Sequence, residues 1–317
     1  MSEKCVTVIY IAGLGRSGST LLAELLSLRS GVLSVGELPK IWHHGWRDNW
    51  CSADGYQFST SPVWRRVLQR LRILDPGFEE EDAFKLSDRM LTHRNWRPFW
   101  LFFGLSDARS HVYQMQFDLL YRALSDVTRS SVIVDSGKLP YHAALMVRSK
   151  AVKLKVVHLV RDPRAVAYSK QRTKTNLNLS SDQKRTMRRE NALRVSLRWI
   201  WHNFLVRMVC LRCEDTVLVR YEDLVQDPNK VLERILGSSG LEFYGVSGPK
   251  DARANSIAFT GNSSRFGTNS HRIKPDFEWT LKLPLSQLAL ISLLTLPLRF
   301  WLGYGGLFRL KTGRKAS

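Results

Sequence analysis

The stretch VTVIYIAGLGRSGST, residues 6–20, decides the fold class. Its first part, Val6–Ile11, is apolar and rich in β-branched residues, which is typical of a buried strand. Ala12–Gly18 then supplies three glycines, and Thr20–Leu28 is predicted to form a helix. A strand, a glycine loop and a helix in this order are the beginning of an α/β protein.

The rest of the chain continues this alternation. Further strands are predicted at Val32–Val35, Ser131–Val134, Lys155–Val160 and Val217–Val219. Helices are predicted at Gln114–Val127, Asp182–Val209 and Pro228–Leu236, and another begins after Arg161, with Asp162 as N-cap and Pro163 in the first helical position. Because the strands are nearly all apolar, we predict an α/β fold with a P-loop-like, mostly parallel sheet flanked by helices. In such a sheet the ligand lies beyond the carboxyl ends of the strands.

The composition fits one large globular domain with a basic surface. The 317 residues are 44% hydrophobic and 24% charged, which excludes wholesale disorder. We expect a single domain over residues 1–317 with a helical insertion at about 40–110, where Trp and Arg are frequent and strand signals are few. The 48 Lys and Arg outnumber the 28 Asp and Glu and give a formal charge of +20, which favours anionic partners.

Several features favour a cytoplasmic location. Met1 leads through a short apolar run into the glycine loop, without the cleavage pattern of a signal peptide. Leu283–Leu298, the most apolar stretch, is broken by Pro297 and is predicted to be a packed C-terminal helix rather than a membrane span. Four cysteines are too few for a disulfide scaffold, and the CxxC pair of Cys210 and Cys213 is expected to be structural.

The glycine loop is predicted to bind an anion. Glycines let successive backbone N–H groups turn inward, and the N-terminus of the next helix adds a favourable field for negative charge. Ser17, Ser19 and Thr20 offer hydroxyl donors. A nucleotide-triphosphate P-loop, GxxxxGK[ST], needs a lysine where Gly18 stands, and the cation of this loop, Arg16, comes earlier. A P-loop kinase or hydrolase is therefore the disfavoured alternative.

Gly15–Leu22 resembles the 5′-phosphosulfate loop of the sulfotransferases that use 3′-phosphoadenosine 5′-phosphosulfate (PAPS), in the arginine form seen in tyrosylprotein, carbohydrate and bacterial members. Val157–Lys170 resembles the family's 3′-phosphate motif, in which an arginine and a serine grip that phosphate. Here Arg161 follows a predicted strand and Ser169 lies about two helical turns beyond the cap, so both can face one phosphate. The resemblance runs from about residue 6 to residue 304.

Three more segments fit the same family. Tyr221–Pro228 is similar to its YEDL…DP segment, whose tyrosine lies near the adenine. Val134–Lys138 looks like the D-S-S-K segment of bacterial members, with Gly137 in place of a serine, which implies that Lys138 reaches the sulfuryl or bridging oxygen. Gly261–Phe266 resembles a late GNxxRF segment. The residues implied to bind the donor are Gly15, Arg16, Ser17, Gly18, Ser19, Thr20, Arg161, Ser169, Tyr221 and Arg265.

Sulfuryl transfer needs a base for the acceptor proton and positive charge at the leaving oxygen. Glu37 directly follows a predicted strand, resembles the base of tyrosylprotein and several bacterial members, and is the predicted base. Arg16 and Lys138 are predicted to stabilise the charge. His43 and His44 are the alternative bases, because hormone-type members use histidine. We expect no metal, and no metal-ligand pattern is visible in the sequence.

The acceptor is the least determined partner. A hydroxyl or amine of a small molecule, a natural product or a glycolipid is expected, with 3′-phosphoadenosine 5′-phosphate as the nucleotide product. The tryptophans of the insertion either line the acceptor pocket or form the core of the insertion: Trp42, Trp46, Trp50, Trp64, Trp96 and Trp100. The non-enzymatic alternative is a basic module that binds nucleic acid or an anionic membrane. No nucleic-acid motif is visible, whereas peripheral membrane contact stays open.

Overall fold

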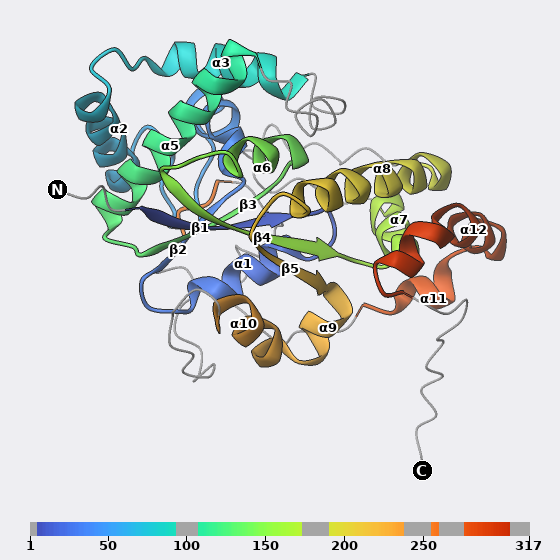
Figure 1. Cartoon of the computed structure of the whole chain (residues 1–317). Helices are drawn as coiled ribbons and strands as arrows, with labels where there is room; N and C mark the ends of the chain where they lie inside the picture. The colour runs from blue at the N-terminus through green and yellow to red at the C-terminus, as the bar shows by residue number, and fades with distance from the viewer. Residues whose placement is uncertain (1–4, 93–106, 173–189, 238–254, 260–275, 305–317) are drawn as a thin grey trace.

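The computed structural model describes residues 5–92, 107–172, 190–237, 255–259 and 276–304. At its centre lies one sheet of five parallel strands in the order β2-β3-β1-β4-β5 (Figure 1). The strands are β1 (Val6–Ala12), β2 (Val32–Gly36), β3 (Val132–Lys138), β4 (Val152–Val160) and β5 (Asp215–Arg220). This confirms the predicted α/β fold with a parallel sheet.

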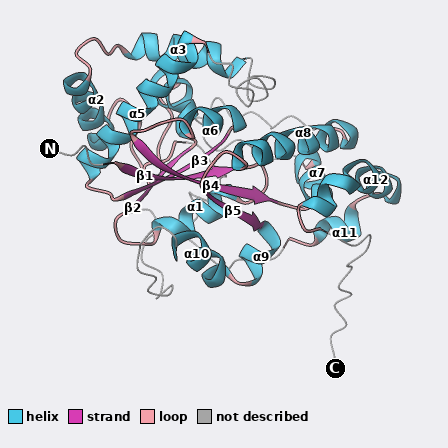
Figure 2. Ribbon diagram, in the orientation of Figure 1, coloured by secondary structure: helices cyan, strands magenta, loops and turns pink. Residues whose placement is uncertain are grey.

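Helices cover both faces of the sheet (Figure 2). One face carries α1 (Ser19–Ser27), α9 (Tyr221–Gln226) and α10 (Pro228–Leu236). The other face carries α2 (Pro62–Leu74), α3 (Glu80–Thr92), α5 (Ala108–Thr128), α6 (Pro140–Met146) and part of α8 (Ala192–Cys210). At the β5 end of the sheet lie α7 (Pro163–Gln171), α11 (Glu278–Lys282) and α12 (Leu285–Trp301).

The two faces arise from the alternation of side chains along each strand. Val8 and Tyr10 of β1 pack in the cluster under α5 and α6, whereas Ile9 and Ile11 pack against α1 and α10. Because both sides of these strands are buried, most residues of β1 and β4 are apolar. The buried polar residues of β4 have partners: Lys155 donates to the Ile235 carbonyl, and His158 contacts Asn203. Between β2 and α2 the chain forms a 3-10 turn, η1 (Leu38–Lys40), and a π-helical segment, η2 (Ile41–Arg47).

Most of the predicted elements lie where expected, and three differ. The long helix α8 begins at Ala192, where Asn191 caps it by accepting a hydrogen bond from the Arg194 amide, and the first part of the helix predicted from Asp182 lies outside the described residues. Pro297 lies inside α12 and does not end it. The structure extends the strand predicted at Ser131–Val134 through Lys138, which brings the whole D-S-G-K segment onto the sheet edge.

Three smaller expectations concern a helix cap, the cysteines and the apolar C-terminal stretch. Asp162 caps α7 through the Arg164 amide, as predicted. All four cysteines are free thiols. In the described parts of the chain, no helix has both the length and the apolar character needed to cross a membrane.

Candidate active site

The glycine loop between β1 and α1 depends on two of its glycines. A Cβ on Gly13 would lie 2.2 Å from the carbonyl oxygen of Leu159. Gly18 has a φ of +92° and packs against Tyr221, whose ring carbon would lie 2.4 Å from an added Cβ. Gly15, by contrast, faces open space. The loop is therefore wedged between β4 and α9, and its tight turn ends at the first N–H groups of α1, which have no partner within the helix.

Arg161, at the carboxyl end of β4, connects this loop with α7. Its side chain is only 7% exposed, and its Nη1 donates to the backbone oxygen of Arg16 at 3.1 Å. Its Nη2 donates to Asp276 at 3.1 Å, and its guanidinium stacks on the Tyr221 ring at 4.3 Å. Its Nε is buried with no hydrogen-bond partner in the described part of the chain. Ser169 on α7 is buried as well.

Arg16 itself occupies a strained backbone position. Its φ is +79°, in the left-handed region that costs a residue with a side chain about 1–2 kcal/mol. Burial lowers the pKa of its half-buried guanidinium. Arg16 also lies near enough to Lys170 to contribute to the lowered pKa of that amine, of which burial is the first cause. The loop cation is therefore electrostatically coupled to the amine of α7.

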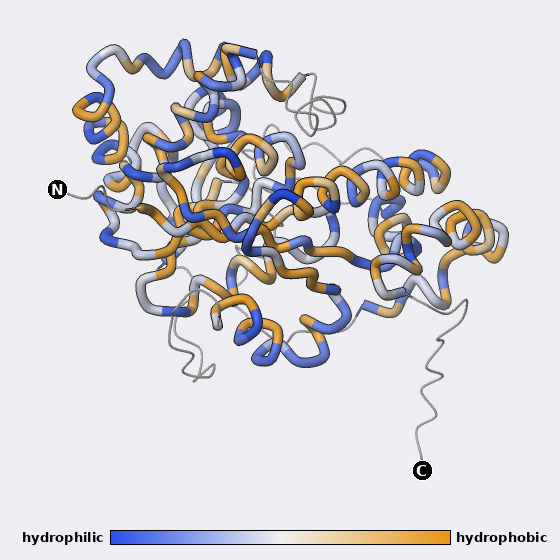
Figure 3. The backbone as a smooth tube through the Cα atoms, viewed as in Figure 1, coloured by the Kyte–Doolittle hydropathy of each residue, from blue (hydrophilic) through white to orange (hydrophobic). Residues whose placement is uncertain are grey.

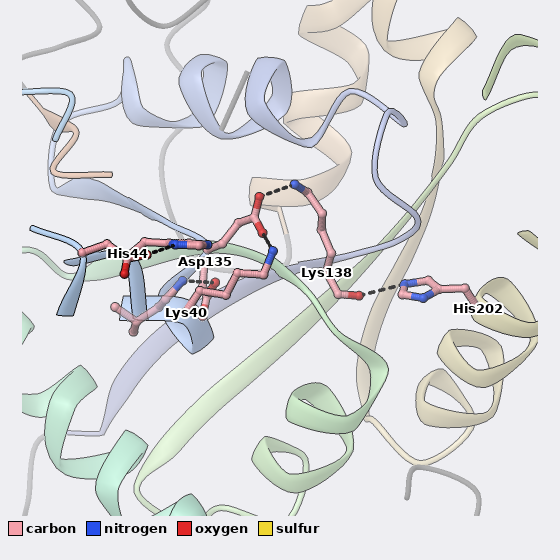
Figure 4. A network of polar contacts seen from close by, with 8 residues as sticks. Lys40, His44, Asp135, Lys138 and His202 are labelled. Carbon is pink, nitrogen blue, oxygen red and sulfur yellow. Dashed lines mark hydrogen bonds and ion pairs between the residues drawn. The ribbon is translucent and has the colours of Figure 1, made fainter. Parts of the chain in front are cut away.

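A second cluster forms where β2 and β3 end side by side. Glu37 follows β2, and its two carboxylate oxygens accept hydrogen bonds from Lys138 and Lys40, each at 2.6 Å. Figure 4 shows both lysines reaching the same carboxylate from opposite sides. The Glu37 side chain is 10% exposed, Lys138 is 17% exposed and Lys40 is 37% exposed.

These lysines control the ionisation of Glu37. Burial by itself would raise the pKa of the carboxyl, but the charges and hydrogen bonds of Lys138 and Lys40 outweigh burial and hold the pKa well below its usual value. Glu37 is therefore a carboxylate over the whole physiological range. While both lysines remain bound to it, it is a weak proton acceptor.

The backbone of Lys138 is held by its own set of contacts. Lys138 has a φ of +67°, and its carbonyl oxygen accepts hydrogen bonds from His202 of α8 at 3.0 Å and from the amide of Gly13 (Figure 4). The preceding residue, Gly137, has no room for a side chain, because a Cβ there would lie 2.7 Å from Pro39 and 2.8 Å from the Tyr10 hydroxyl. This crowding explains why glycine stands where the related segment has serine.

Asp135 fixes the corner that carries Glu37. It lies within β3 and is fully buried, and its Oδ1 accepts a hydrogen bond from the Leu38 amide at 3.3 Å. Its Oδ2 accepts from the Tyr121 hydroxyl at 2.6 Å. Burial raises the pKa of Asp135 to about 7, against the opposing hydrogen bonds from Tyr121 and from the amides of Leu38 and Gly137. Asp135 thus joins the end of β2 to α5.

The buried chain of polar groups continues from Tyr121 to His142 of α6 and on to Tyr113. Because Tyr121 gives its only proton to Asp135, it accepts from Nε2 of His142 at 3.1 Å. Nδ1 of His142 then accepts from the Tyr113 hydroxyl at 3.2 Å. Burial lowers the pKa of His142 to about 3, so this ring is neutral and each bond has a donor and an acceptor.

The two alternative bases belong to the segment η2. His44 stacks on Trp50 with ring centroids 3.9 Å apart, and its Nδ1 lies 3.3 Å from Asp48. Its pKa is lowered, first of all by burial, and Glu37 and Lys40 act on it through their charges. His43 contacts Asp88 of α3 at 3.1 Å and Phe84 through its ring edge. His44 is therefore close to the carboxylate cluster, and His43 is directed to α3.

The structure thus brings most of the predicted site residues to the carboxyl edge of the sheet. Glu37 and Lys138 are in direct contact, and Arg16, Arg161 and Tyr221 are connected through Arg161. Arg265, Trp96 and Trp100 lie outside the described residues. Of the other tryptophans, Trp42 and Trp64 are core residues, while Trp46 and Trp50 are half-buried.

Sequence reasoning missed four residues that hold the site: Lys40, Asp135, His202 and Asp276. Two of them had a local signal: Lys40 lies three positions after the predicted base, and Asp135 belongs to the same D-S-G-K segment as Lys138. His202 and Asp276 come from segments whose position beside the site is decided by the fold. No three His, Cys, Asp or Glu side chains of the described residues gather as metal ligands would.

Comparison with known proteins shows the family of the chain. The profile of the sulfotransferase family matches residues 9–244. No curated protein matches the sequence. Among solved structures, the sulfotransferase domain of the olefin synthase from Synechococcus PCC 7002 is 20% identical, with a TM-score of 0.47 over 92% of this chain and 96% of that one. Because the family profile spans well over half of the 317 residues, this chain belongs to the sulfotransferase family.

Proposed function

We propose that this sulfotransferase takes its sulfuryl group from PAPS and transfers it to a hydroxyl or amine of a small molecule. PAPS carries negative charge at two separate places, the 5′-phosphosulfate and the 3′-phosphate. A protein that binds it needs two anion sites at a fixed spacing. The observation that carries the proposal is the hydrogen bond from Arg161 to the backbone of Arg16, which ties the glycine loop to the Arg161–Ser169 pair.

The residues at both places suit an anion. Arg161 is buried and has one N–H without a partner in the described part of the chain, although an unpaired buried donor costs about 1–3 kcal/mol. A phosphate oxygen at this N–H would remove that cost. Ser169, Ser17 and Ser19 are buried hydroxyls on the same side of the sheet edge. Tyr221, which packs on Gly18 and under Arg161, offers its ring to the adenine.

We assign the chemistry to the pair Glu37 and Lys138. When bound, PAPS supplies the activated sulfuryl group and the leaving oxygen. Glu37 takes the proton of the acceptor, and Lys138 supplies positive charge at the leaving oxygen. The ion pair couples these two roles. As the Lys138 ammonium turns from Glu37 toward the donor, the carboxylate loses one of its two cations and its pKa rises, so that Glu37 becomes a stronger base when the donor is in place.

The acceptor side is best assigned to the segment after Glu37. Trp46, Trp50 and His44 are half-buried and follow the base within 13 residues of chain, whereas Trp42 and Trp64 are buried in the core and are unavailable to an acceptor. A ring-bearing alcohol of a natural product or a glycolipid suits such a lining. The aromatic side chains would cover its apolar surface, and Glu37 would meet its hydroxyl.

A thermal-shift series tests the donor. We expect 3′-phosphoadenosine 5′-phosphate to raise the unfolding temperature of the protein, and AMP and ATP with Mg²⁺ to have little effect. At a hundred times its dissociation constant a ligand adds about 2.7 kcal/mol to the stability. The variant Arg161→Ala should lose this shift, while Arg72→Ala, an exposed arginine of α2 far from the site, should keep it. A shift with ATP and Mg²⁺ but none with the bisphosphate would refute the proposal and favour a kinase or hydrolase.

The base is tested separately. Glu37→Gln should keep the bisphosphate-induced shift and lower turnover of a simple phenol with PAPS by about 10²–10⁴-fold. His44→Gln serves as the matched variant, because it changes the other titratable group beside the site. Near-normal turnover in Glu37→Gln together with a loss in His44→Gln would transfer the role of base to the histidine.

A further inference from the structure

Helix α12 is apolar on the side that faces away from the protein. A helix at the surface of a soluble protein normally has a polar outer face. On α12 the inner side is formed by Ile291, Thr295 and Leu298, which are buried against α7 and α8. The outer side carries Leu285, Leu293 and Phe300, which are 83%, 73% and 74% exposed. Figure 3 shows this helix largely in the colour of hydrophobic residues at the edge of the molecule.

The spacing of these residues makes one continuous stripe. Ala289, Leu293 and Phe300 are separated by four and seven positions, which places them on one face of the helix. Leu290, Leu296 and Trp301 are exposed to either side of this stripe. The charged residue of α12, Arg299, is buried.

Neighbouring elements extend the apolar surface. Leu193 and Leu197 of α8 are about half exposed, and Phe277 and Leu281 of α11 are more so. Since α8 packs along α12 and α11 precedes it directly, the helices that carry these side chains lie together at one edge of the molecule (Figure 1). We call this set, from α8, α11 and α12, the apolar edge. Contiguous exposed apolar patches on a protein surface usually mark an interaction site.

Positive charge surrounds the apolar edge. Lys282, the last residue of α11, is 63% exposed. Arg194 and Arg198, the latter paired with Glu190, are exposed on α8 beside its two leucines. Arg207 of α8 lies over the Trp301 ring at 5.2 Å. Glu278 is the acidic residue of α11 and is already paired with Lys282 and Arg172.

We propose that the apolar edge docks the protein onto the surface of an anionic membrane. Leucine, phenylalanine and tryptophan inserted among lipid chains, with arginine and lysine at the headgroups, are the pattern of an interfacial helix. Each basic side chain near such a surface contributes about 1 kcal/mol. A second copy of the chain fits less well, because a symmetric contact would bring two basic rims and two proteins of formal charge +20 together.

Vesicle flotation with the full chain tests the proposal. We expect binding to vesicles of phosphatidylcholine with about 30% phosphatidylglycerol that weakens as salt is raised, and at least tenfold weaker binding to phosphatidylcholine alone. The double variant Leu293→Glu, Phe300→Glu should bind the anionic vesicles at least tenfold more weakly than the natural chain. Its charge-matched control is Ile73→Glu, Met115→Glu, which alters two exposed apolar residues of α2 and α5 and should bind as the natural chain does.

A lysine variant separates insertion from simple attraction. Leu293→Lys, Phe300→Lys adds positive charge, so it should bind more tightly if charge alone held the protein, and more weakly if the apolar side chains insert. Far-UV circular dichroism and thermal unfolding check that each variant is folded. The proposal is refuted by tighter binding of the lysine variant, by equal losses in the face and control variants, or by absence of binding. It is also refuted if sedimentation shows a dimer that the glutamate variant dissolves. None of these measurements depends on the donor or on the acceptor.

Discussion

Replacing Gly18 with alanine tests how the donor loop is built. Gly18 has a φ of +92° and lies against the Tyr221 ring, so a methyl group there meets two separate costs. The left-handed backbone costs a residue with a Cβ about 1–2 kcal/mol. The overlap with the ring carbon at 2.4 Å forces Tyr221 to move, and overpacking of this kind costs about 1–3 kcal/mol. Alanine regains less than about 1 kcal/mol through the unfolded chain.

We therefore expect Gly18→Ala to lower the free energy of unfolding by about 2–4 kcal/mol, measured by urea unfolding at neutral pH. Gly15→Ala is the matched control in the same loop. Gly15 has open space around it and an ordinary φ, so this variant should be unchanged or up to about 1 kcal/mol more stable.

A double-mutant cycle separates the two costs. Tyr221→Ala removes the ring, so in its background Gly18→Ala should keep only the backbone cost, about 1–2 kcal/mol. Equal stability of Gly18→Ala and the natural protein would refute the described loop conformation. An effect of Gly18→Ala that is the same with and without the Tyr221 ring would refute the packing of α9 on the loop.

Three further predictions concern the carboxylates of the site, each measured by urea unfolding. Lys138→Met should lower the stability at pH 7 by about 1–3 kcal/mol and Lys40→Met by less than about 1 kcal/mol, because Lys40 is the more exposed partner of Glu37. Glu37 has a lowered pKa, so both losses should shrink as the pH falls below about 4.5, where the unfolded chain takes up the proton. Asp135 has a raised pKa of about 7, so its burial costs the folded state more as the pH rises from about 4 to 7. The variant Asp135→Asn should therefore gain about 2 kcal/mol relative to the natural chain between pH 5 and pH 7.5, and a constant difference would contradict the raised pKa. Tyr121→Phe, which leaves two buried groups without their partner, should cost about 1–3 kcal/mol, and a neutral effect would contradict the buried hydrogen-bonded chain.

The sequence predicts the sheet well because its signals are local. Val6–Ile11 and Lys155–Val160 are mostly apolar and rich in β-branched residues, as a strand buried on both faces requires, and the structure has β1 and β4 there. The cap at Asp162 is also predictable from the sequence, since an acceptor followed by proline specifies a helix start. The start of α8 is not predictable in this way, because the basic residues before Asn191 are compatible with a helix and the choice of cap depends on its surroundings.

The contacts of the site are harder to predict, because they join segments far apart in the chain. Glu37 and Lys138 are 101 positions apart and meet because β2 and β3 are neighbouring strands. That neighbourhood depends on the strand order, which local patterns do not specify. His202 belongs to α8 and Asp276 lies two residues before α11, and neither sequence shows a sign of a site. The sequence predicts α12 as a packed helix for a related reason. An apolar residue gives the same sequence signal whether its side chain faces the protein or its surroundings.

Glu37 and Asp135 are two carboxyl groups at the ends of neighbouring strands, and the site shifts their pKa values in opposite directions. Both are buried, but Glu37 has two ammonium groups within hydrogen-bonding distance and Asp135 has hydroxyl and amide donors, so one pKa falls and the other rises. A charged Asp135 would repel Glu37 and oppose its ionisation. Because its raised pKa keeps Asp135 largely protonated below neutral pH, Asp135 does not compete with Glu37 for the charges of the two lysines. No natural residue would hold a permanent negative charge at position 135, but the proton on Asp135 can be removed by raising the pH. We therefore expect the hold of Lys138 on Glu37, measured as the coupling energy of Lys138→Met with Glu37→Gln, to change between pH 6 and pH 8 in the natural background and to stay constant in Asp135→Asn.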